Sequence, residues 1–350
     1  MLVALAAGLV TGASAGAVAG AQGPVAGPQA ASSVFERELP GRLARAIQAG
    51  RRSELARLGA RAGAGGLRPI LMTRAHESPQ GWGAAPTERA AWLAAVLAAP
   101  AAEDAWDLLS PLAVLAAGPD RTLATSAASS AADIATRLDR DWHALYEVKD
   151  IAPTILAAAQ QSWLDLAADP GRWVDVRVLA LEIGVSLGRV LHLFADDART
   201  STPRGPARPP GEVLAERAID AEPALRRAAF ELMDEPLLPA QRALAGKAVA
   251  DPEPEVALAA AQALCSGLGL GAAPAPILAA LDEPGRARLR DLIADPAHAP
   301  AARIDAARCL AAMGDAPSRR ALEALRASLP RDLRGLTPRE PRSRRSRGHR

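Results

Sequence analysis

The chain has 350 residues, a formal net charge of +2 and 49% hydrophobic residues, but aromatic residues make up only 3%. A chain of this length can bury a large core, and its scarcity of aromatic and β-branched residues argues against a strand-rich fold. Its two cysteines are too few for a disulfide framework, and their spacing fits no zinc motif. Ala, Leu and Arg, which have high helix propensity, are abundant instead, so the composition predicts an all-α protein.

The N-terminal segment 1–21 is typical of a secretory signal peptide. Its first ten residues form a short apolar run, small residues that fit a cleavage site follow, and no charged side chain occurs before Glu36. The basic residues that usually precede such a run are missing. Glycines recur every fourth residue from Gly8 to Gly20, a spacing that also suits a packed membrane helix. We therefore expect an exported protein, periplasmic or secreted, with membrane anchoring by residues 1–21 as the alternative.

The next segments predict a linker and then a long helical region. Residues 22–33 are rich in small residues and proline, which indicates a flexible linker. Region 34–198 has the apolar spacing of helices but repeats less regularly than the region after it. A Pro/Gly-rich loop at 199–211 separates it from the more regular segment 212–330. The helices expected in the first part of region 34–198 span 39–49, 52–62, 86–99, 102–117, 119–138 and 150–168.

Four segments of the chain share one helical pattern. Two of them open at Asp220 and Asp251, displaced by 31 residues, and further copies begin near Val174 and Ala301. Each copy places small or apolar residues on a single face of a helix. Asp-Pro and Glu-Pro steps recur between the copies, and such steps end one helix and cap or open the next. The sequence therefore predicts repeated helix pairs joined by tight turns.

These segments resemble HEAT repeats, in particular the short bacterial type related to phycobilisome-lyase HEAT domains. The shared pattern is an aspartate in the turn, an apolar residue followed by arginine, and then two small residues, as in the copy with Asp220 and Arg226. The second copy departs from it, because Ala257 stands where arginine is expected. The resemblance covers about residues 170–328 without 199–211. It implies an α-solenoid of stacked antiparallel helix pairs. Loop 199–211 could separate an N-terminal helical region from this solenoid, but we favour one continuous superhelix with an insertion because the pattern appears on both sides of the loop.

The resemblance also assigns roles to the recurring polar residues. In HEAT proteins the turn aspartate and the helix arginine commonly bond along the stack, which implies a structural ladder from the pairs Asp220 with Arg226 and Asp295 with Arg303. Polar residues also align on the other flank of the inner helices. In a solenoid such residues can line the concave surface that holds a partner. The aligned candidates are Glu182, Glu231, Gln262 and Arg308.

No motif in the sequence assembles a catalytic or metal site. His192 and Asp196 lie one helical turn apart, but two ligands do not make a metal site, and no nucleophile motif accompanies them. We therefore expect no cofactor, no metal and no enzymatic activity. Cys265 and Cys309 fall near the same place in successive inner helices, where a disulfide needs Cα atoms within about 7 Å. We favour two buried free thiols.

The C-terminal segment 331–350 is strongly basic. It holds eight arginines against Asp332 and Glu340, a net charge of +6, so the other residues together carry about −4. This composition predicts a disordered tail that could bind a polyanion: nucleic acid, anionic lipid or polysaccharide. The residues expected to carry that binding are Arg342, Arg344, Arg345 and Arg347.

Two functions follow from these observations. The first is a monomeric, non-enzymatic scaffold that is exported and binds a protein partner along its concave face. The alternative is a polyanion- or nucleic-acid-associated protein of the same fold, anchored by the arginine-rich tail.

Overall fold

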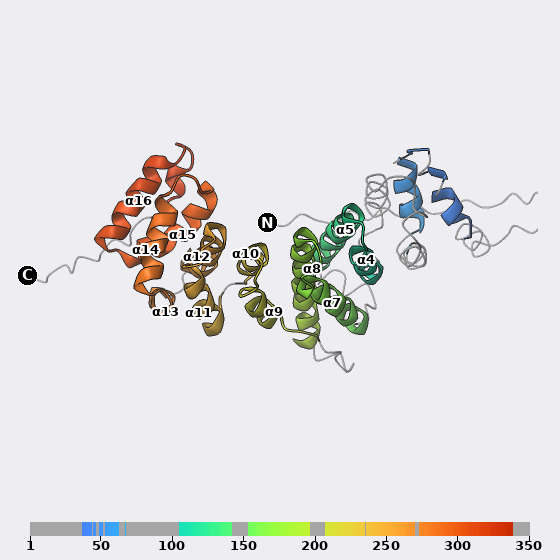
Figure 1. Ribbon diagram of the computed structural model, residues 1–350, viewed down its shortest axis with the longest axis horizontal. Helices are drawn as coiled ribbons and strands as arrows, with labels where there is room; N and C mark the ends of the chain where they lie inside the picture. The colour runs from blue at the N-terminus through green and yellow to red at the C-terminus, as the bar shows by residue number, and fades with distance from the viewer. Residues whose placement is uncertain are drawn as a thin grey trace, which may run out of the picture.

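A computed structural model defines the architecture of the chain (Figure 1). It describes residues 37–62 with gaps at 44, 47–48 and 52, then 67, 105–141, 153–196, 207–234, 236–269 and 273–338. The regular elements of these residues are all helices, which confirms the all-α prediction. Segments 1–21 and 22–33, the helix expected at 86–99 and the four tail arginines proposed for polyanion binding lie outside the described residues.

Most of the helices listed here begin close to a residue that favours a helix start. The first are the 3-10 helix η2 (Ala105–Leu108), α4 (Leu109–Ala116), α5 (Arg121–Arg140), α7 (Pro153–Ala168) and α8 (Val174–Asp196). Then come α9 (Pro210–Arg217), α10 (Pro223–Glu231), α11 (Pro239–Ala248) and α12 (Pro254–Gly269). The last are α13 (Pro274–Ala279), α14 (Glu283–Ala294), α15 (Pro300–Met313), α16 (Ala316–Ser328) and the 3-10 helix η3 (Arg334–Leu336).

Several helices start with an acidic cap, and many carry a proline in the first turn. The side chain of Asp120 accepts hydrogen bonds from the backbone at the start of α5, and Glu222 caps α10 immediately before Pro223. Asp315 caps α16 in the same way, directly after Gly314 ends α15 with a positive φ of 64°. Glycine adopts this left-handed conformation without a steric penalty, so a sharp turn fits between the last two helices. These caps confirm the tight turns that the sequence predicts.

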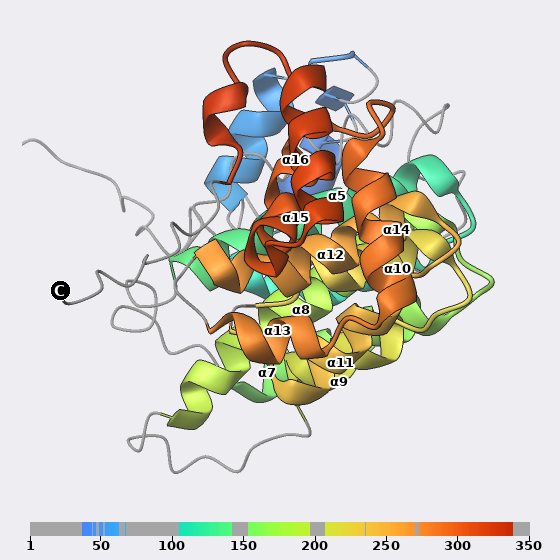
Figure 2. The same cartoon turned by 90° about the vertical axis from the view of Figure 1, so that its left-hand side faces the viewer.

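The helices form two layers. Helices α5, α8, α10, α12 and α15 pack side by side in chain order, and we call them the inner layer. Each packs against the helix that precedes it, so α4, α7, α9, α11 and α14 form pairs with them. The short α13 lies beside α12 and α15, and α16 closes the end by packing on both α14 and α15. Figure 2 looks along this arrangement from the α16 end, with successive pairs lying behind one another.

Small side chains let these helices approach closely. In α5 the alanines at 124, 127, 128 and 131 are fully buried, and they form the stripe that faces the core. Gly246 of α11 lies so near the backbone of α13 that an added Cβ would come within 2.1 Å of the Ala280 carbonyl oxygen. One large side chain is also buried: the Trp163 indole donates to the Leu109 carbonyl at 3.2 Å and ties α7 to α4. Close packing of this kind maximises dispersion contacts between helices.

Packing continues from α8 to α9 and α10 on the two sides of the predicted loop 199–211. The loop prediction overruns the start of α9, which begins at Pro210. Gln160 of α7 is buried, and its amide nitrogen donates to the carbonyls of Gly184 and Arg208 at 3.2 and 2.9 Å. Its amide oxygen accepts from the Arg208 backbone at 3.1 Å. The chain therefore re-enters the stack at a fixed place.

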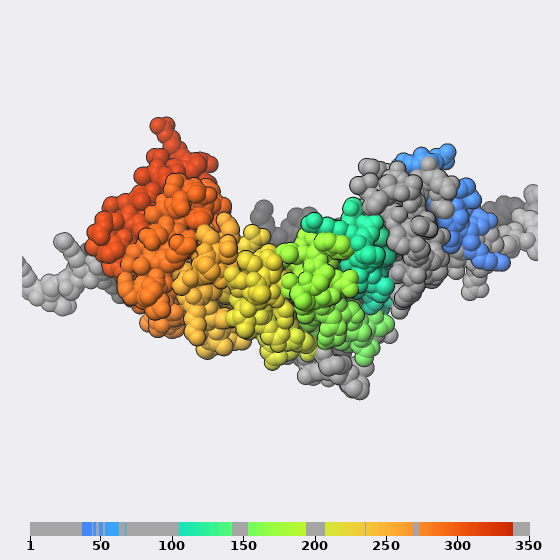
Figure 3. All heavy atoms as spheres, in the orientation of Figure 1, coloured from blue at the N-terminus to red at the C-terminus, as the bar shows by residue number. Residues whose placement is uncertain are grey.

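The assembled helices make an elongated, curved body. Its outline in Figure 3 is hollowed between the α15–α16 end and α5, on the side where Figure 1 shows the inner layer. Beyond α16, residues 331–338 form a turn and η3, although the sequence assigns them to the disordered tail. No helix of the described residues is long and apolar enough to span a bilayer.

Candidate functional site

Arginines of the inner layer bind aspartates of the next helix pair. Arg177 of α8 reaches Asp220, in the turn before α10, with Nη2 to Oδ2 at 3.3 Å. Arg226 of α10 makes a two-pronged pair with Asp251, in the turn before α12, with both N–O distances at 2.9 Å. The side chains of both pairs are at most 15% exposed. We call this row of contacts the arginine ladder, and charge-assisted hydrogen bonds of this kind are stronger than those between neutral groups.

Each ladder arginine also satisfies carbonyl oxygens of its own helix pair. Arg177 Nε donates to the Ala167 carbonyl of α7 at 3.1 Å, and Arg303 Nε donates to the Ile293 carbonyl of α14 at 2.8 Å. The last carbonyls of a helix have no partner within that helix, so a guanidinium there acts as a C-terminal cap. In α15 the forward contact goes to the Ser328 hydroxyl at 2.8 Å, which stands in place of an aspartate.

The predicted ladder pairs are displaced by one helix pair. The Asp220 carboxylate binds Arg177 and Arg217, while Arg226 donates to the Asp220 backbone carbonyl at 2.9 Å. Arg303 bonds to carbonyls of α14 and to Ser328 rather than to the carboxylate of Asp295. The partners differ from the predicted ones for a geometric reason. The guanidinium groups of Arg177 and Arg226 point along the stack, so each meets the turn of the following helix pair.

The turn aspartates have a second role in shaping the turns. In each of four turns, one carboxylate oxygen accepts from the backbone N–H two residues ahead at 2.9 Å. This contact is an Asx turn, which lets an aspartate side chain replace a backbone hydrogen bond. For Asp220 and Asp251 the same carboxylate also binds the arginine of the preceding pair. The aspartates in question are Asp169, Asp220, Asp251 and Asp295.

The ladder is interrupted between α12 and α15. Ala257 is fully buried at the position that corresponds to Arg226, so α12 has no guanidinium there to reach Asp295. The Asp295 carboxylate lies 3.8 Å from the imidazole of His298 instead. The same step contains the disulfide between Cys265 of α12 and Cys309 of α15, with Cα atoms 5.4 Å apart.

The disulfide corrects the prediction of two free thiols. Both cysteines are fully buried, as expected, but the two helices approach closely enough for their Cα atoms to meet the geometric requirement of a disulfide. Such bonds persist in oxidising compartments and are rare where thiol reductants are abundant. The covalent link therefore fits a protein that resides in an oxidising compartment.

The four polar residues predicted on the inner layer lie on four different helices. Glu182 of α8 is half-buried and Glu231 of α10 is exposed, while Gln262 of α12 and Arg308 of α15 are intermediate. Gln262 donates to Asp305 of α15 at 3.3 Å, and Arg308 pairs with the same aspartate at 3.2 Å. Asp305, which the sequence analysis missed, thus joins two of the predicted residues across the α12–α15 step.

The other two residues form a like-charged neighbourhood. Burial, and secondly the nearby charge of Glu231, raise the pKa of the Glu182 carboxyl. Glu231 has a cation of its own, because Arg227 lies 3.5 Å away on the same helix. Loss of hydration without a matching cation disfavours the charged form of Glu182. A positive group placed beside Glu182 would relieve this electrostatic cost.

A second polar cluster surrounds Arg189, in the C-terminal half of α8. Arg189 pairs with Asp234 at 2.7 Å, donates to the Leu232 carbonyl at 2.7 Å and lies 3.7 Å from Asp139 of α5. Arg189 of α8 therefore links α5 to the end of α10 and the turn that follows it. Partial burial raises the pKa of Asp139, while the Arg189 charge lowers it and that of Asp234 raises it.

The polar contacts described above join neighbouring helix pairs or lie on the inner layer. In the part of the chain that the structure describes, no group of three or more His, Cys, Asp or Glu side chains is arranged to hold a metal ion. The chain is an all-helical protein whose helices pack in sequential pairs. No protein-family model matches the sequence, and no curated protein matches it.

Proposed function

We propose that this chain is an exported, non-enzymatic HEAT-like scaffold that binds a protein partner along the hollow side of its inner layer. The single observation that carries the proposal is the row of Glu182, Glu231, Gln262 and Arg308, which presents polar groups on four successive inner helices. A row that crosses several stacked elements suits an extended partner rather than a small substrate.

The HEAT-like assignment is supported by recurrence within the stack. Consecutive helix pairs, aspartate turns and forward-reaching arginines repeat from α8 to α12, as expected when each unit contacts mainly its neighbours. Repeat units of this kind bury their apolar faces only by stacking. We propose that the same superhelix extends from α4 to α16, including the pair α4 and α5.

Partner chemistry follows from the charges on the row. Glu182 is half-buried next to Glu231, so a basic side chain of the partner would gain two carboxylate contacts there. Near the α15 end the row offers Gln262, Asp305 and Arg308, which can donate and accept hydrogen bonds. We therefore propose a partner segment that carries lysine or arginine where it crosses α8 and α10.

A matched pair of charge reversals tests this proposal. The full chain and its Glu231→Lys variant are used to capture proteins from native lysate, and capture is quantified by mass spectrometry. Glu212→Lys is the control, because Glu212 is an exposed glutamate on α9 of the other layer. We expect a partner that is lost at least tenfold in Glu231→Lys and retained in Glu212→Lys. Equal recovery by both variants would contradict binding on the inner layer.

Export is supported by the buried disulfide together with the apolar N-terminal run. Intact-mass analysis of the protein from its native host tests it. We expect a mature chain that begins near residue 16 or 22 and has no free thiol. A soluble form that keeps Met1 would contradict export, whether or not the partner experiment succeeds.

A further inference from the structure

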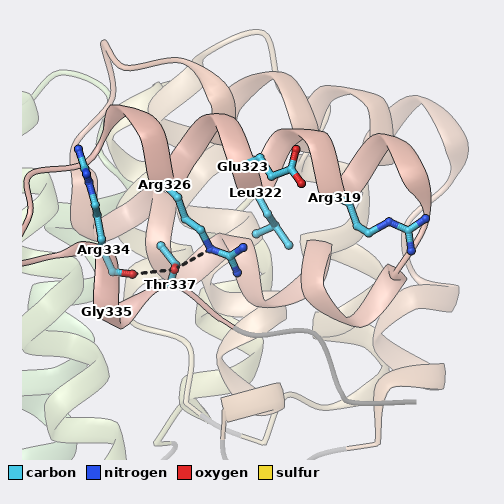
Figure 4. Close-up of a pocket in the computed structure, with 7 residues that line it drawn as sticks. All are labelled: Arg319, Leu322, Glu323, Arg326, Arg334, Gly335 and Thr337. Carbon is cyan, nitrogen blue, oxygen red and sulfur yellow. Dashed lines mark hydrogen bonds between the residues drawn. The ribbon is translucent and has the colours of Figure 1, made fainter. Parts of the chain in front are cut away.

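A pocket of about 540 Å³ opens beside α16, and its described lining residues include none of the row of polar residues on α8 to α15 (Figure 4). One wall is a stripe of α16 formed by Arg319, Leu322, Glu323 and Arg326, which are spaced as neighbours on one helix face. The opposite wall includes Thr337, in the segment that follows η3. Leu322 is 2% exposed and gives the stripe an apolar base.

The guanidinium of Arg326 is held in place by neutral groups. Its Nε donates to the Thr337 hydroxyl at 3.1 Å, and its Nη2 donates to the Pro338 carbonyl at 2.9 Å. The Thr337 hydroxyl donates in turn to the Arg334 carbonyl at 2.8 Å, which leaves its oxygen free to accept from Arg326. These acceptors orient the cation without neutralising it, unlike the aspartates that bind Arg177 and Arg226.

A second cation lies further along the same helix. Arg319 contributes to the pocket wall and donates through Nη1 to the Gly314 carbonyl at 3.1 Å. The seven-residue spacing separates the Cα atoms of Arg319 and Arg326 by about 10 Å along the helix axis. Glu323 lies between them and is the acidic side chain among the described lining residues (Figure 4). The segment 316–338 as a whole carries five arginines against Glu323 and Asp332, a net charge of +3.

We propose that this pocket binds a small elongated dianion, with one oxyanionic group at Arg319, the other at Arg326 and an apolar body over Leu322. Preorganised guanidinium groups favour carboxylate and phosphate because their fixed donors match these oxyanions. The proposal does not depend on the partner-binding function, because the pocket uses α16 and η3 rather than the hollow side of the inner layer.

Isothermal titration calorimetry on the full chain at low salt tests this inference. One arm uses suberate, a dicarboxylate, and the other uses hexane-1,6-diyl bisphosphate, so the two arms distinguish the two kinds of oxyanion. Hexanoate, a monoanion, is the comparison ligand. We expect at least one dianion to bind at least tenfold more tightly than hexanoate, with an affinity that falls as salt is added. Failure of both dianions to bind would overturn the proposal.

Substitutions then locate the site. We expect Arg319→Gln and Arg326→Gln each to weaken the bound dianion by about 10-fold or more, as for the loss of a charge-assisted hydrogen bond. Glu323→Gln should tighten binding severalfold, a gain that a misfolded variant would not produce. Arg320→Gln is the matched control, because Arg320 is an exposed arginine of the same helix outside the pocket wall.

The basic C-terminal segment needs its own control. A variant in which Arg342, Arg344, Arg345 and Arg347 are all replaced by glutamine should keep the affinity of the full chain. Loss of binding in that variant alone, or equal losses in Arg320→Gln and Arg326→Gln, would show nonspecific attraction to arginine and overturn the pocket assignment.

Discussion

Helices α10 and α12 are joined by different chemistry from helices α12 and α15. In the first, the buried pair between Arg226 and Asp251 joins one helix pair to the next. In the second, the arginine position is Ala257 and the join is the disulfide between Cys265 and Cys309. Successive inner helices are thus joined by an ion pair in one place and by a disulfide in the other, and only the disulfide depends on the redox state of the compartment.

Removing the covalent tie should have the largest effect on stability. The disulfide closes a loop with a sequence separation of 44 residues, so chain entropy alone gives it about 4 kcal/mol. We expect the Cys265→Ala/Cys309→Ala variant to lose about that much free energy of unfolding, measured by urea denaturation. A reductant should destabilise the wild type equally and leave the variant unchanged. Equal stability of the two proteins would mean that packing alone holds this step.

Breaking the ion pair between Arg226 and Asp251 should lower the free energy of unfolding by somewhat less than removing the disulfide does. Arg226→Met leaves the largely buried Asp251 without its cation, and we expect a loss of about 2–3 kcal/mol in the free energy of unfolding. The effect should be independent of reductant, which separates the two kinds of step. In a double-mutant cycle, adding Asp251→Asn should recover part of the loss. A fully additive double variant would argue that Arg226 acts only through the Asp220 carbonyl.

An arginine at position 257 should restore an ionic link between α12 and the turn before α15. We expect Ala257→Arg, introduced into the Cys265→Ala/Cys309→Ala variant, to regain about 1 kcal/mol by reaching Asp295, since ionic hydrogen bonds contribute on this scale. The buried side chains of Arg177 and Arg303 show that corresponding positions accommodate a guanidinium. Asp295→Asn should abolish the gain. Further destabilisation by Ala257→Arg would mean that close packing, rather than an absent tie, fixes alanine there.

The smallest expected change in the free energy of unfolding comes from Glu182, in the row of polar residues, rather than from the ion pair or the disulfide. Because its pKa is raised, the folded protein holds the Glu182 proton more tightly than the unfolded chain does. Folding therefore loses stability as the pH rises through the pKa of Glu182 in the folded protein. We expect Glu182→Gln to be more stable than the wild type by about 0.5 kcal/mol at neutral pH. The difference should vanish below about pH 4, where the carboxyl is protonated in both states.

The sequence was informative about local structure and less so about which residues meet. Asp220 and Asp251 are expected in turns because an acid-proline step, which restricts the backbone locally, lies at or just after each of them, and both do lie in turns. Their arginine partners were misassigned because spacing along one helix does not reveal the direction of a guanidinium. Cys265 and Cys309 were correctly expected at similar places on successive inner helices, but only the closeness of those helices decides between thiols and a disulfide.

The pocket beside α16 could not be predicted for a related reason. The arginine-rich composition of 331–350 predicts disorder, yet residues 331–338 are ordered through hydrogen bonds to neutral acceptors. Every residue has a backbone carbonyl, so the amino-acid composition cannot predict which carbonyls these arginines bind. Thr337 was a usable signal: a hydroxyl between arginines and just before Pro338 can fix both a turn and a side chain.

The disulfide also constrains how the chain could grow or shrink over evolution. A duplicated helix pair inserted between α10 and α12 would bring its own arginine and aspartate, and the ladder could run through the new copy without a gap. An insertion between α12 and α15 would separate Cys265 from Cys309, whose Cα atoms are 5.4 Å apart, and would strand both thiols. A repeat inserted at this place would therefore break the disulfide, whereas one inserted between α10 and α12 would leave it intact.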